Sequence, residues 1–369
     1  MLRKRKIMNI LLNPGPVNLS DRVRNALLRP DLCHREVEFS QLQSTIREKL
    51  LQIYDLSGER WAAVLLTGSG TAAMEAMVTS LVPRNGKLLV IENGVYGERL
   101  SKIANIHGIE YTTLHHPWGA EIDLKRLVTL LDENDDITHL AVVHHETTTG
   151  RLNNLAQLGA ICQERKIQLL VDAVSSFGAE ELNFESWGIT ACAATANKCL
   201  HGVPGTAFVI VRRDAMADAN TPRTLYLDLA TYCQQQDKGG TPFTQSVQVF
   251  YALAEALQEL EEAGGWRARH SYYSQLVSLV RDGLFAMGIQ PLLPATSSSV
   301  VLNAFYLPEG FSYDEFHDQL KAQGYVIYAG QGTLAKSIFR VSTMGAIARA
   351  DMERFVAVVK QFISVDYSS

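Results

Sequence analysis

Lys198 is the residue whose surroundings point most directly to chemistry. It lies within residues 191–205, where small uncharged residues precede it and a Gly-Val-Pro-Gly turn follows. A buried ammonium group is costly unless it is paired or loses its proton, and a deprotonated lysine is a nucleophile for carbonyl groups. A lysine that only extends to solvent from a strand end explains neither the small residues nor the turn. The segment therefore predicts a Schiff base with an aldehyde cofactor, pyridoxal phosphate.

Asp172 is the second residue that fits such a cofactor. It ends an apolar run at residues 169–171, one predicted strand before Lys198. A carboxylate there can pair with a protonated pyridine nitrogen, which keeps the ring an electron sink. The alternative is an aspartate that caps the turn at Ser175 and Ser176. Because Lys198 needs the same cofactor, the pair favours the first interpretation.

A glycine-rich turn predicts a site for a phosphate. Residues 67–73 read Thr-Gly-Ser-Gly-Thr-Ala-Ala and lead from an apolar run into a helical pattern. The backbone amides of Gly70 and Thr71 at a helix start face an anion, and the hydroxyls of Ser69 and Thr71 add donors. The turn therefore predicts the binding site of the cofactor phosphate.

Tyr96 supplies an aromatic ring at another strand end. It lies in Asn93-Gly-Val-Tyr-Gly97, and a ring between glycines can lie flat on a cofactor. The alternative is a turn tyrosine whose hydroxyl faces solvent. With the lysine, the aspartate and the phosphate turn, Tyr96 completes a set that fits one cofactor.

The elements that must position these residues form an α/β pattern. Short apolar runs alternate with helical patterns, which is typical of a mostly parallel sheet with crossover helices. Ligands of such sheets bind outside the carboxyl ends of the strands, where the polar residues above gather. The predicted strands cover residues 62–66, 87–91, 139–144, 168–171, 192–196 and 207–211.

The chain changes character after about residue 245. We expect a large domain at residues 20–250 and a smaller α+β domain at residues 251–369, with residues 1–19 packed on the smaller one. Gly264 and Gly265 are predicted to end the first helix of this part. The predicted helices there cover residues 250–263, 269–286, 313–323 and 351–363, and the predicted strands cover residues 299–305, 325–328 and 338–341.

Composition excludes several partners. The net charge of -5 offers no basic surface for nucleic acid, and no apolar run approaches the length that spans a bilayer. The five cysteines are scattered and odd in number, which indicates reduced thiols and a cytoplasmic location. Residues 1–8 are basic and lack the features of a signal peptide, so we expect a frayed leader.

Two rival sites are weaker. Gly68, Gly70 and Ala73 match a dinucleotide-binding fingerprint, with Glu92 placed to hold a ribose, but a nicotinamide oxidoreductase leaves Asp172 and Lys198 unexplained. The His-His pairs at residues 115–116 and 144–145 offer one metal ligand each, because neighbours on a strand point to opposite faces. We therefore expect no metal.

Several segments of the chain resemble the class V, fold-type I aminotransferases that use pyridoxal phosphate. Within that family they are similar to the branch that transfers the amino group of 2-aminoethylphosphonate to pyruvate. The resemblance implies a large domain with a mostly parallel sheet flanked by helices and a smaller C-terminal α+β domain. The segments that carry it are residues 13–16, 67–70, 93–97, 145–150, 171–178, 196–205 and 339–340.

The resemblance also implies roles for single residues. Lys198 would bond to the cofactor, Asp172 would face the pyridine nitrogen and Tyr96 would stack on the ring. Arg340 would grip the acidic group of the substrate, with Gly15 beside it; the alternative for Arg340 is a surface salt bridge. The other residues implied to bind the cofactor are Ser69, Gly70 and Thr71 at the phosphate, Thr147 near the 3-hydroxyl group, Asn197, and Thr244 of a partner subunit.

A Thr244 that reaches a neighbouring site implies a homodimer with a shared active site. The implied substrates are an aminophosphonate and a 2-oxo acid, in either direction of the reaction. Residues 31–39 depart from the form typical of degradative members, and His34 and Arg35 are further candidate cations near the substrate. The open alternatives are an alanine– or serine–glyoxylate aminotransferase, another aminophosphonate aminotransferase, and an inactive protein with this fold that only binds.

Overall fold

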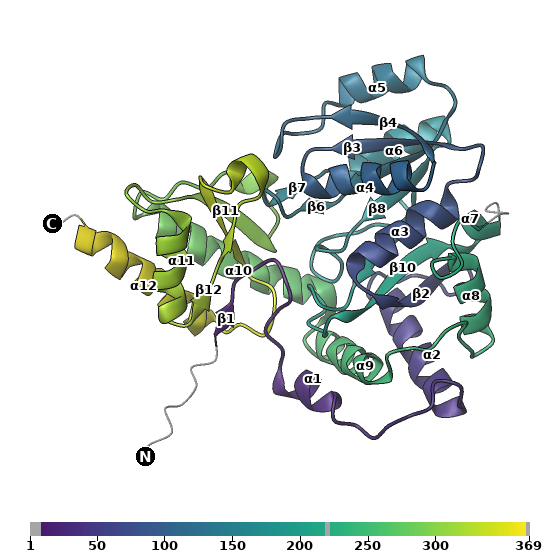
Figure 1. The fold of residues 1–369 in the computed structure, drawn as a ribbon, viewed down its shortest axis with the longest axis horizontal. Helices are drawn as coiled ribbons and strands as arrows, with labels where there is room; N and C mark the ends of the chain where they lie inside the picture. Colours follow the sequence, from purple (N-terminus) through teal and green to yellow (C-terminus); the bar gives the residue numbers. More distant parts are fainter. Residues whose placement is uncertain (1–8, 218–221, 367–369) are drawn as a thin grey trace.

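The computed structural model describes residues 9–217 and 222–366, so the predicted leader at residues 1–8 lies outside the described residues. A seven-stranded sheet forms the centre of the larger part of the molecule (Figure 1). Its strands, in spatial order, are β2 (Trp61–Gly68), β10 (Gly205–Arg212), β9 (Ile189–Thr195), β8 (Gln168–Asp172), β5 (Ile137–Val143), β3 (Lys87–Glu92) and β4 (Glu110–His115).

Six of these strands were predicted from the sequence, and each lies within two or three residues of its predicted bounds. Only β10 runs antiparallel to its neighbours, β2 and β9, so the sheet is mostly parallel as expected. The seventh strand, β4, was not predicted. It is an edge strand in which only Leu114 is buried, and it therefore lacks the apolar run of the others.

Helices cover both faces of the sheet and bury an apolar core on each. Strands buried on both faces need apolar side chains throughout, and the inner strands supply them. The helices that pack into one core are α3 (Gly70–Leu81), α4 (Val95–Ile106) and α8 (Leu229–Asp237). Those in the other core are α2 (Val37–Gln52), α5 (Leu124–Glu133), α6 (Leu155–Arg165) and α9 (Val247–Glu262). The remaining elements of this part are α1 (Asp21–Ala26), α7 (Arg213–Ala217), β6 (His145–Glu146) and β7 (Arg151–Leu152).

A three-stranded antiparallel sheet organises the rest of the chain, beside the large sheet in Figure 1. Ile10 and Leu12 pack into its core, while the assignment of residues 1–19 to this part stays a prediction. The division of the chain at residue 250 stays a prediction. The elements here are β1 (Ile10–Leu11), α10 (Gly265–Phe285), β11 (Leu302–Tyr306), α11 (Tyr313–Ala322), β12 (Tyr325–Val326), β13 (Tyr328–Ala329), β14 (Ile338–Ser342) and α12 (Arg349–Asp366), with short 3-10 turns at Ala295–Ser297 and Gly332–Leu334.

Two predicted boundaries in this part were wrong. The strand predicted from residue 299 begins at Leu302, because Ser299 Oγ and the Val300 N–H donate hydrogen bonds to the side chain of Glu180 instead of to a neighbouring strand. The helix predicted from residue 269 begins at Gly265, directly after Gly264 takes a left-handed conformation with φ 95°. None of the described helices is both long and apolar enough to cross a bilayer.

Candidate active site

The carboxyl ends of two adjacent parallel strands bring Asp172 and Lys198 together. Asp172 ends β8 and pairs in register with Ala193 of β9, while Lys198 follows the end of β9. The two groups are close enough that each shifts the pKa of the other. The sheet therefore positions the predicted nucleophile and the predicted carboxylate in one region.

Lys198 is held by the N-terminal segment of the chain. Its Nζ donates a hydrogen bond to the carbonyl oxygen of Pro14. Its aliphatic carbons lie against Gly15, where an added Cβ would come within 2.8 Å of Lys198 Cδ and where φ is +109°. Burial lowers the pKa of Lys198 to about 8. The amine is therefore far easier to deprotonate than an exposed lysine, as a carbonyl nucleophile requires.

Asp172 caps the turn that follows its strand, and its pairing with a ring nitrogen stays a prediction. Its Oδ1 accepts a hydrogen bond from the backbone N–H of Val174 at 2.9 Å, so it does cap the following turn. Burial raises its pKa to about 7, with Glu146 adding to the rise, while Arg99 and Lys198 oppose it. A buried carboxylate with one capped oxygen gains most from a cationic partner, such as a protonated ring nitrogen.

The predicted phosphate turn lies next to the turn that follows Asp172. Ser69 is the exposed N-cap residue of α3 and its side chain makes no capping bond, while Gly70 and Thr71 begin the helix. An added Cβ on Gly70 would meet Val174 at 2.8 Å. This close approach, possible only for glycine, places the N-terminus of α3 against the turn that follows Asp172.

Tyr96 is fixed in the first turn of α4 by a buried carboxylate. Glu146 Oε2 accepts hydrogen bonds from the backbone N–H groups of Tyr96 and Gly97, at 3.1 and 3.3 Å. An added Cβ on Gly94 would lie 2.2 Å from Glu146, so glycine is required there as well. The Glu146 carboxylate thus stabilises the helix start that carries the aromatic ring.

Arg340 is buried and has no carboxylate partner in the described part of the chain. It is 1% exposed, and it donates from Nε to the carbonyl of Ala329 and from Nη1 to the carbonyl of Thr147, both at 2.8 Å. Nη2 is buried without a hydrogen bond. The surface salt bridge considered from the sequence is therefore wrong. A buried guanidinium whose charge is not paired with a carboxylate can bind an anionic ligand.

Thr147, whose carbonyl binds Arg340, also has a buried polar atom without a hydrogen-bond partner. It is fully buried, and its Oγ1 has no hydrogen-bond partner among the described residues. Asn197, beside Lys198, accepts a hydrogen bond on Oδ1 from Thr195 at 2.9 Å. Both residues lie in the segments where the sequence predicted cofactor contacts, and Thr147 has a hydroxyl free for one.

Three predicted residues are not joined to this cluster. Thr244 is exposed on the single chain described here, as a residue that acts on a partner subunit would be, and its role stays a prediction. In the described part of the chain, neither His34 nor Arg35 forms a hydrogen bond or ion pair with Lys198 or Arg340. Their roles also stay predictions.

Sequence reasoning missed Arg99. It lies on α4, donates from Nη1 to Thr71 Oγ1 at 3.2 Å, and places its Cζ 4.6 Å from the centroid of the Tyr96 ring. The signal was available in the helical spacing, because residues three apart share a face of a helix. The spacing could not show that this face meets α3.

The strand order excludes the dinucleotide interpretation. A dinucleotide fingerprint needs its glycine-rich turn and the acidic residue at the ends of neighbouring parallel strands. Here β2, which leads to Gly68, and β3, which ends in Glu92, are separated by β10, β9, β8 and β5. Glu92 instead accepts a hydrogen bond from Ser101.

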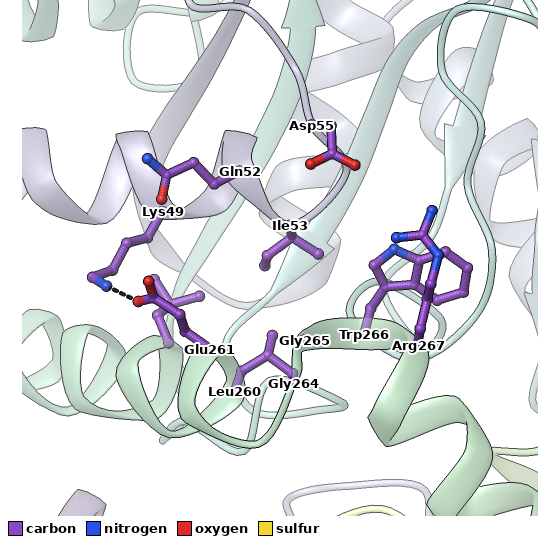
Figure 2. Close-up of a pocket in the computed structure, with 11 residues that line it drawn as sticks. Lys49, Gln52, Ile53, Asp55, Leu260, Glu261, Gly264, Gly265, Trp266 and Arg267 are labelled. Atoms are coloured by element: carbon purple, nitrogen blue, oxygen red, sulfur yellow. Dashed lines mark hydrogen bonds and ion pairs between the residues drawn. The ribbon is translucent and has the colours of Figure 1, made fainter.

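A separate pocket lies between α2 and the junction of α9 with α10 (Figure 2). Lys49 and Glu261 form an ion pair at its edge, and Trp266 and Arg267 line the opposite side. None of the predicted site residues lines this pocket, so it is not the candidate active site.

Comparisons with known proteins identify the family of the chain. The family model for class-V aminotransferases matches residues 21–357. The chain is 38% identical to a 2-aminoethylphosphonate–pyruvate transaminase of Aeromonas hydrophila over 92% of this chain and 91% of that protein. It is 35% identical to a bifunctional phosphonoacetaldehyde hydrolase/aminoethylphosphonate transaminase of Clostridioides difficile, over 96% of this chain but only 56% of that longer protein.

Solved structures show the same fold. An aspartate aminotransferase of subgroup IV from Thermus thermophilus superimposes with a TM-score of 0.88 and 30% identity, over 96% of this chain and 99% of that one. An alanine–glyoxylate aminotransferase from Nostoc sp. gives a TM-score of 0.89 and 25% identity, over 98% of this chain and 97% of that one. The fold is that of fold-type I aminotransferases, and the chain belongs to the class-V aminotransferase family.

Proposed function

We propose that this protein transfers the amino group of 2-aminoethylphosphonate to pyruvate, giving phosphonoacetaldehyde and L-alanine, or runs the reverse reaction. The observation that carries the proposal is the buried guanidinium of Arg340, which has an unused Nη2 and no counter-ion in the described part of the chain. An acidic substrate group would supply the missing anion, through the planar fork that suits carboxylates and phosphonates. The relatives named as aminoethylphosphonate transaminases support the choice of substrate.

Pyridoxal phosphate is the proposed cofactor, and the residues of the site fit it. Its phosphate would bind at Ser69, Gly70 and Thr71, at the start of α3, where the Ser69 side chain makes no capping bond. Thr147 has a buried hydroxyl without a partner, which suits a cofactor oxygen. When bound, the cofactor supplies an aldehyde for the amino group and a ring that accepts electrons.

The chain itself would hold and move protons. Lys198 Nζ, with a pKa of about 8, is partly unprotonated near neutral pH and can accept a proton from the substrate carbon that bears the amino group. The carboxylate of Asp172 would hold a proton on the facing ring nitrogen. Arg340 would orient the substrate by its acidic end, so that the reacting carbon faces Lys198.

We also propose that the protein is a homodimer and that it is located in the cytoplasm. Thr244 is exposed on this chain, and we expect it to reach the phosphate site of a second copy, which makes the active unit a homodimer. All five cysteines are free, four of them buried, which favours the reducing conditions of the cytoplasm. Sedimentation of the purified protein tests the dimer.

A second candidate function keeps the cofactor and changes the substrate. The likeness to the Nostoc alanine–glyoxylate aminotransferase favours it, because one guanidinium also fits a carboxylate. A panel of amino donors with pyruvate or glyoxylate separates the two. Alanine formed from 2-aminoethylphosphonate supports the proposal, whereas turnover of serine or alanine with none of the aminophosphonate overturns it.

A further inference from the structure

Arg99 connects two elements that the proposed cofactor would contact. It lies in α4, three residues after Tyr96, and its guanidinium packs on the Tyr96 ring with Cζ 4.6 Å from the centroid. The same guanidinium donates from Nη1 to Thr71 Oγ1, at the start of α3, at 3.2 Å. In the described part of the chain it forms no ion pair with a carboxylate, so no salt bridge accounts for its position.

The hydrogen bond from Arg99 determines which way the Thr71 hydroxyl can donate its proton. A threonine hydroxyl has one proton to donate and two lone pairs to accept with. When Arg99 occupies a lone pair, the proton of Thr71 stays free for an anion at the N-terminus of α3. The cation also lies over one face of the Tyr96 ring, so a planar cofactor would have to stack on the other face.

We propose that Arg99 is a positioning residue, which orients the Thr71 hydroxyl toward the cofactor phosphate. The proposal rests on the proposed function, because it needs pyridoxal phosphate as the cofactor. The positive charge of Arg99 reaches further into the site, where it opposes the protonation of both Asp172 and Lys198. Arg99 thus influences the site in two ways, by its hydrogen bond to Thr71 and by its positive charge.

Equilibrium binding of two cofactor forms to the apoprotein tests this role. Pyridoxal phosphate and pyridoxal differ only in the phosphate, and binding of either is followed by absorbance. Arg99→Gln should weaken binding of pyridoxal phosphate about tenfold, the usual size for a lost hydrogen bond near a charged group, and change binding of pyridoxal less than about twofold. Arg99→Lys keeps the charge and can still donate a hydrogen bond, and should recover part of the loss.

A double-mutant cycle shows whether Arg99 acts through Thr71. Thr71→Val removes the hydroxyl, and once it is gone, adding Arg99→Gln should weaken binding by less than about twofold more. Lys102→Gln is the matched control, since Lys102 is an exposed cation on the same helix. It should bind both cofactor forms as the parent does. Thermal unfolding of each apoprotein shows that the variants are folded.

The outcomes separate this inference from the proposed function. A parent protein that binds no pyridoxal phosphate overturns the cofactor and the role of Arg99 together. A parent that binds it, with Arg99→Gln unchanged or equally weakened for both cofactor forms, overturns the role of Arg99 alone. Losses that multiply fully in the double variant also overturn it, because Arg99 would then act independently of Thr71.

Discussion

The two ends of the candidate site each bury a cation, but in opposite ways. At the Lys198 end, burial lowers the pKa of the amine to about 8, and Asp172 lies nearby with a pKa raised to about 7. At the Arg340 end, the guanidinium stays charged and is held by two carbonyl oxygens without a carboxylate. The first end is thus built from groups that change charge, as chemistry requires. The second carries a fixed charge, as recognition of an anion requires.

The largest effect should come from removing the amine. Lys198→Ala deletes both the nucleophile and the proposed base, and should reduce transamination at least about a thousandfold, the scale of a lost general base. The variant still has the phosphate turn and should bind the cofactor without a covalent bond. Steady-state turnover and borohydride labelling measure the two properties. Turnover within about tenfold of the parent means that the nucleophile is assigned wrongly.

Asp172→Asn should affect activity and stability in opposite directions. The loss of the facing charge should reduce kcat about a hundredfold, as for other preorganised charges in active sites. An aspartate side chain ordinarily has a pKa of 3.8, whereas burial in the folded protein raises the pKa of Asp172 to about 7. The folded state therefore binds a proton more tightly, and stability falls as pH rises from about 4 to about 7.

Asparagine cannot ionise, so the variant apoprotein should be more stable near pH 8, by about 1–3 kcal/mol. Urea unfolding of parent and variant apoprotein at pH 5 and pH 8 measures this gain. The gain should be smaller at pH 5, where the parent aspartate is mostly protonated. A variant that is less stable than the parent at pH 8 contradicts the charge assigned to this end.

Arg340→Met should weaken substrate recognition and leave the cofactor in place. We expect kcat/KM for the aminophosphonate to fall about a hundredfold, since hydrogen bonds between charged groups are lost, while binding of pyridoxal phosphate stays unchanged. Arg349→Gln is the control, because that arginine is exposed and, among the described residues, forms an ion pair only with Glu353 on its own helix. If Arg340→Met weakened cofactor binding as much as it lowered kcat/KM, Arg340 would not be specific to substrate recognition.

Gly15→Ala tests the contact that holds Lys198. The new Cβ would lie 2.8 Å from Lys198 Cδ, at a φ of +109° that alanine rarely adopts. Moving the lysine should reduce kcat about tenfold, and strain should destabilise the protein by about 1–3 kcal/mol. Steady-state kinetics and thermal unfolding measure these effects. Gly310→Ala, a glycine with φ +85° and open space around its Cβ, controls for backbone strain alone.

The smallest expected effect is on the pH dependence of cofactor uptake. With a pKa of about 8, the unprotonated fraction of Lys198 rises about fivefold between pH 7 and pH 8 and levels off above pH 9. The rate at which apoprotein bonds to pyridoxal phosphate should follow that curve in stopped-flow absorbance. A rate that keeps rising tenfold per pH unit to pH 10 would indicate an ordinary exposed lysine.

The two ends also differ in how well the sequence predicted them. Asp172 and Lys198 follow consecutive strands that are neighbours in the sheet, so local patterns were enough to place them together. Arg340, at the other end, is far from both in the sequence, and only the family resemblance assigned it, as it did Gly15 beside Lys198. Arg99 was missed because its role depends on the meeting of α3 and α4, which no local pattern encodes.

In the fold, too, the sequence predicted the features that local patterns encode and missed those that depend on tertiary contacts. Strands buried on both faces, such as β8 and β9, carry apolar runs and were found within two or three residues. The edge strand β4 is mostly polar and was not found. Hydrophobic pattern thus predicts elements that are buried, whereas edge strands and long-range contacts depend on tertiary structure.

The central claim is that the amine of Lys198 bonds to pyridoxal phosphate. Borohydride reduction of the holoprotein, followed by peptide mass spectrometry, tests it most directly. We predict loss of the visible absorbance and a phosphopyridoxyl group on the peptide that contains Lys198. No visible absorbance before reduction, or a label on another lysine, would contradict the account.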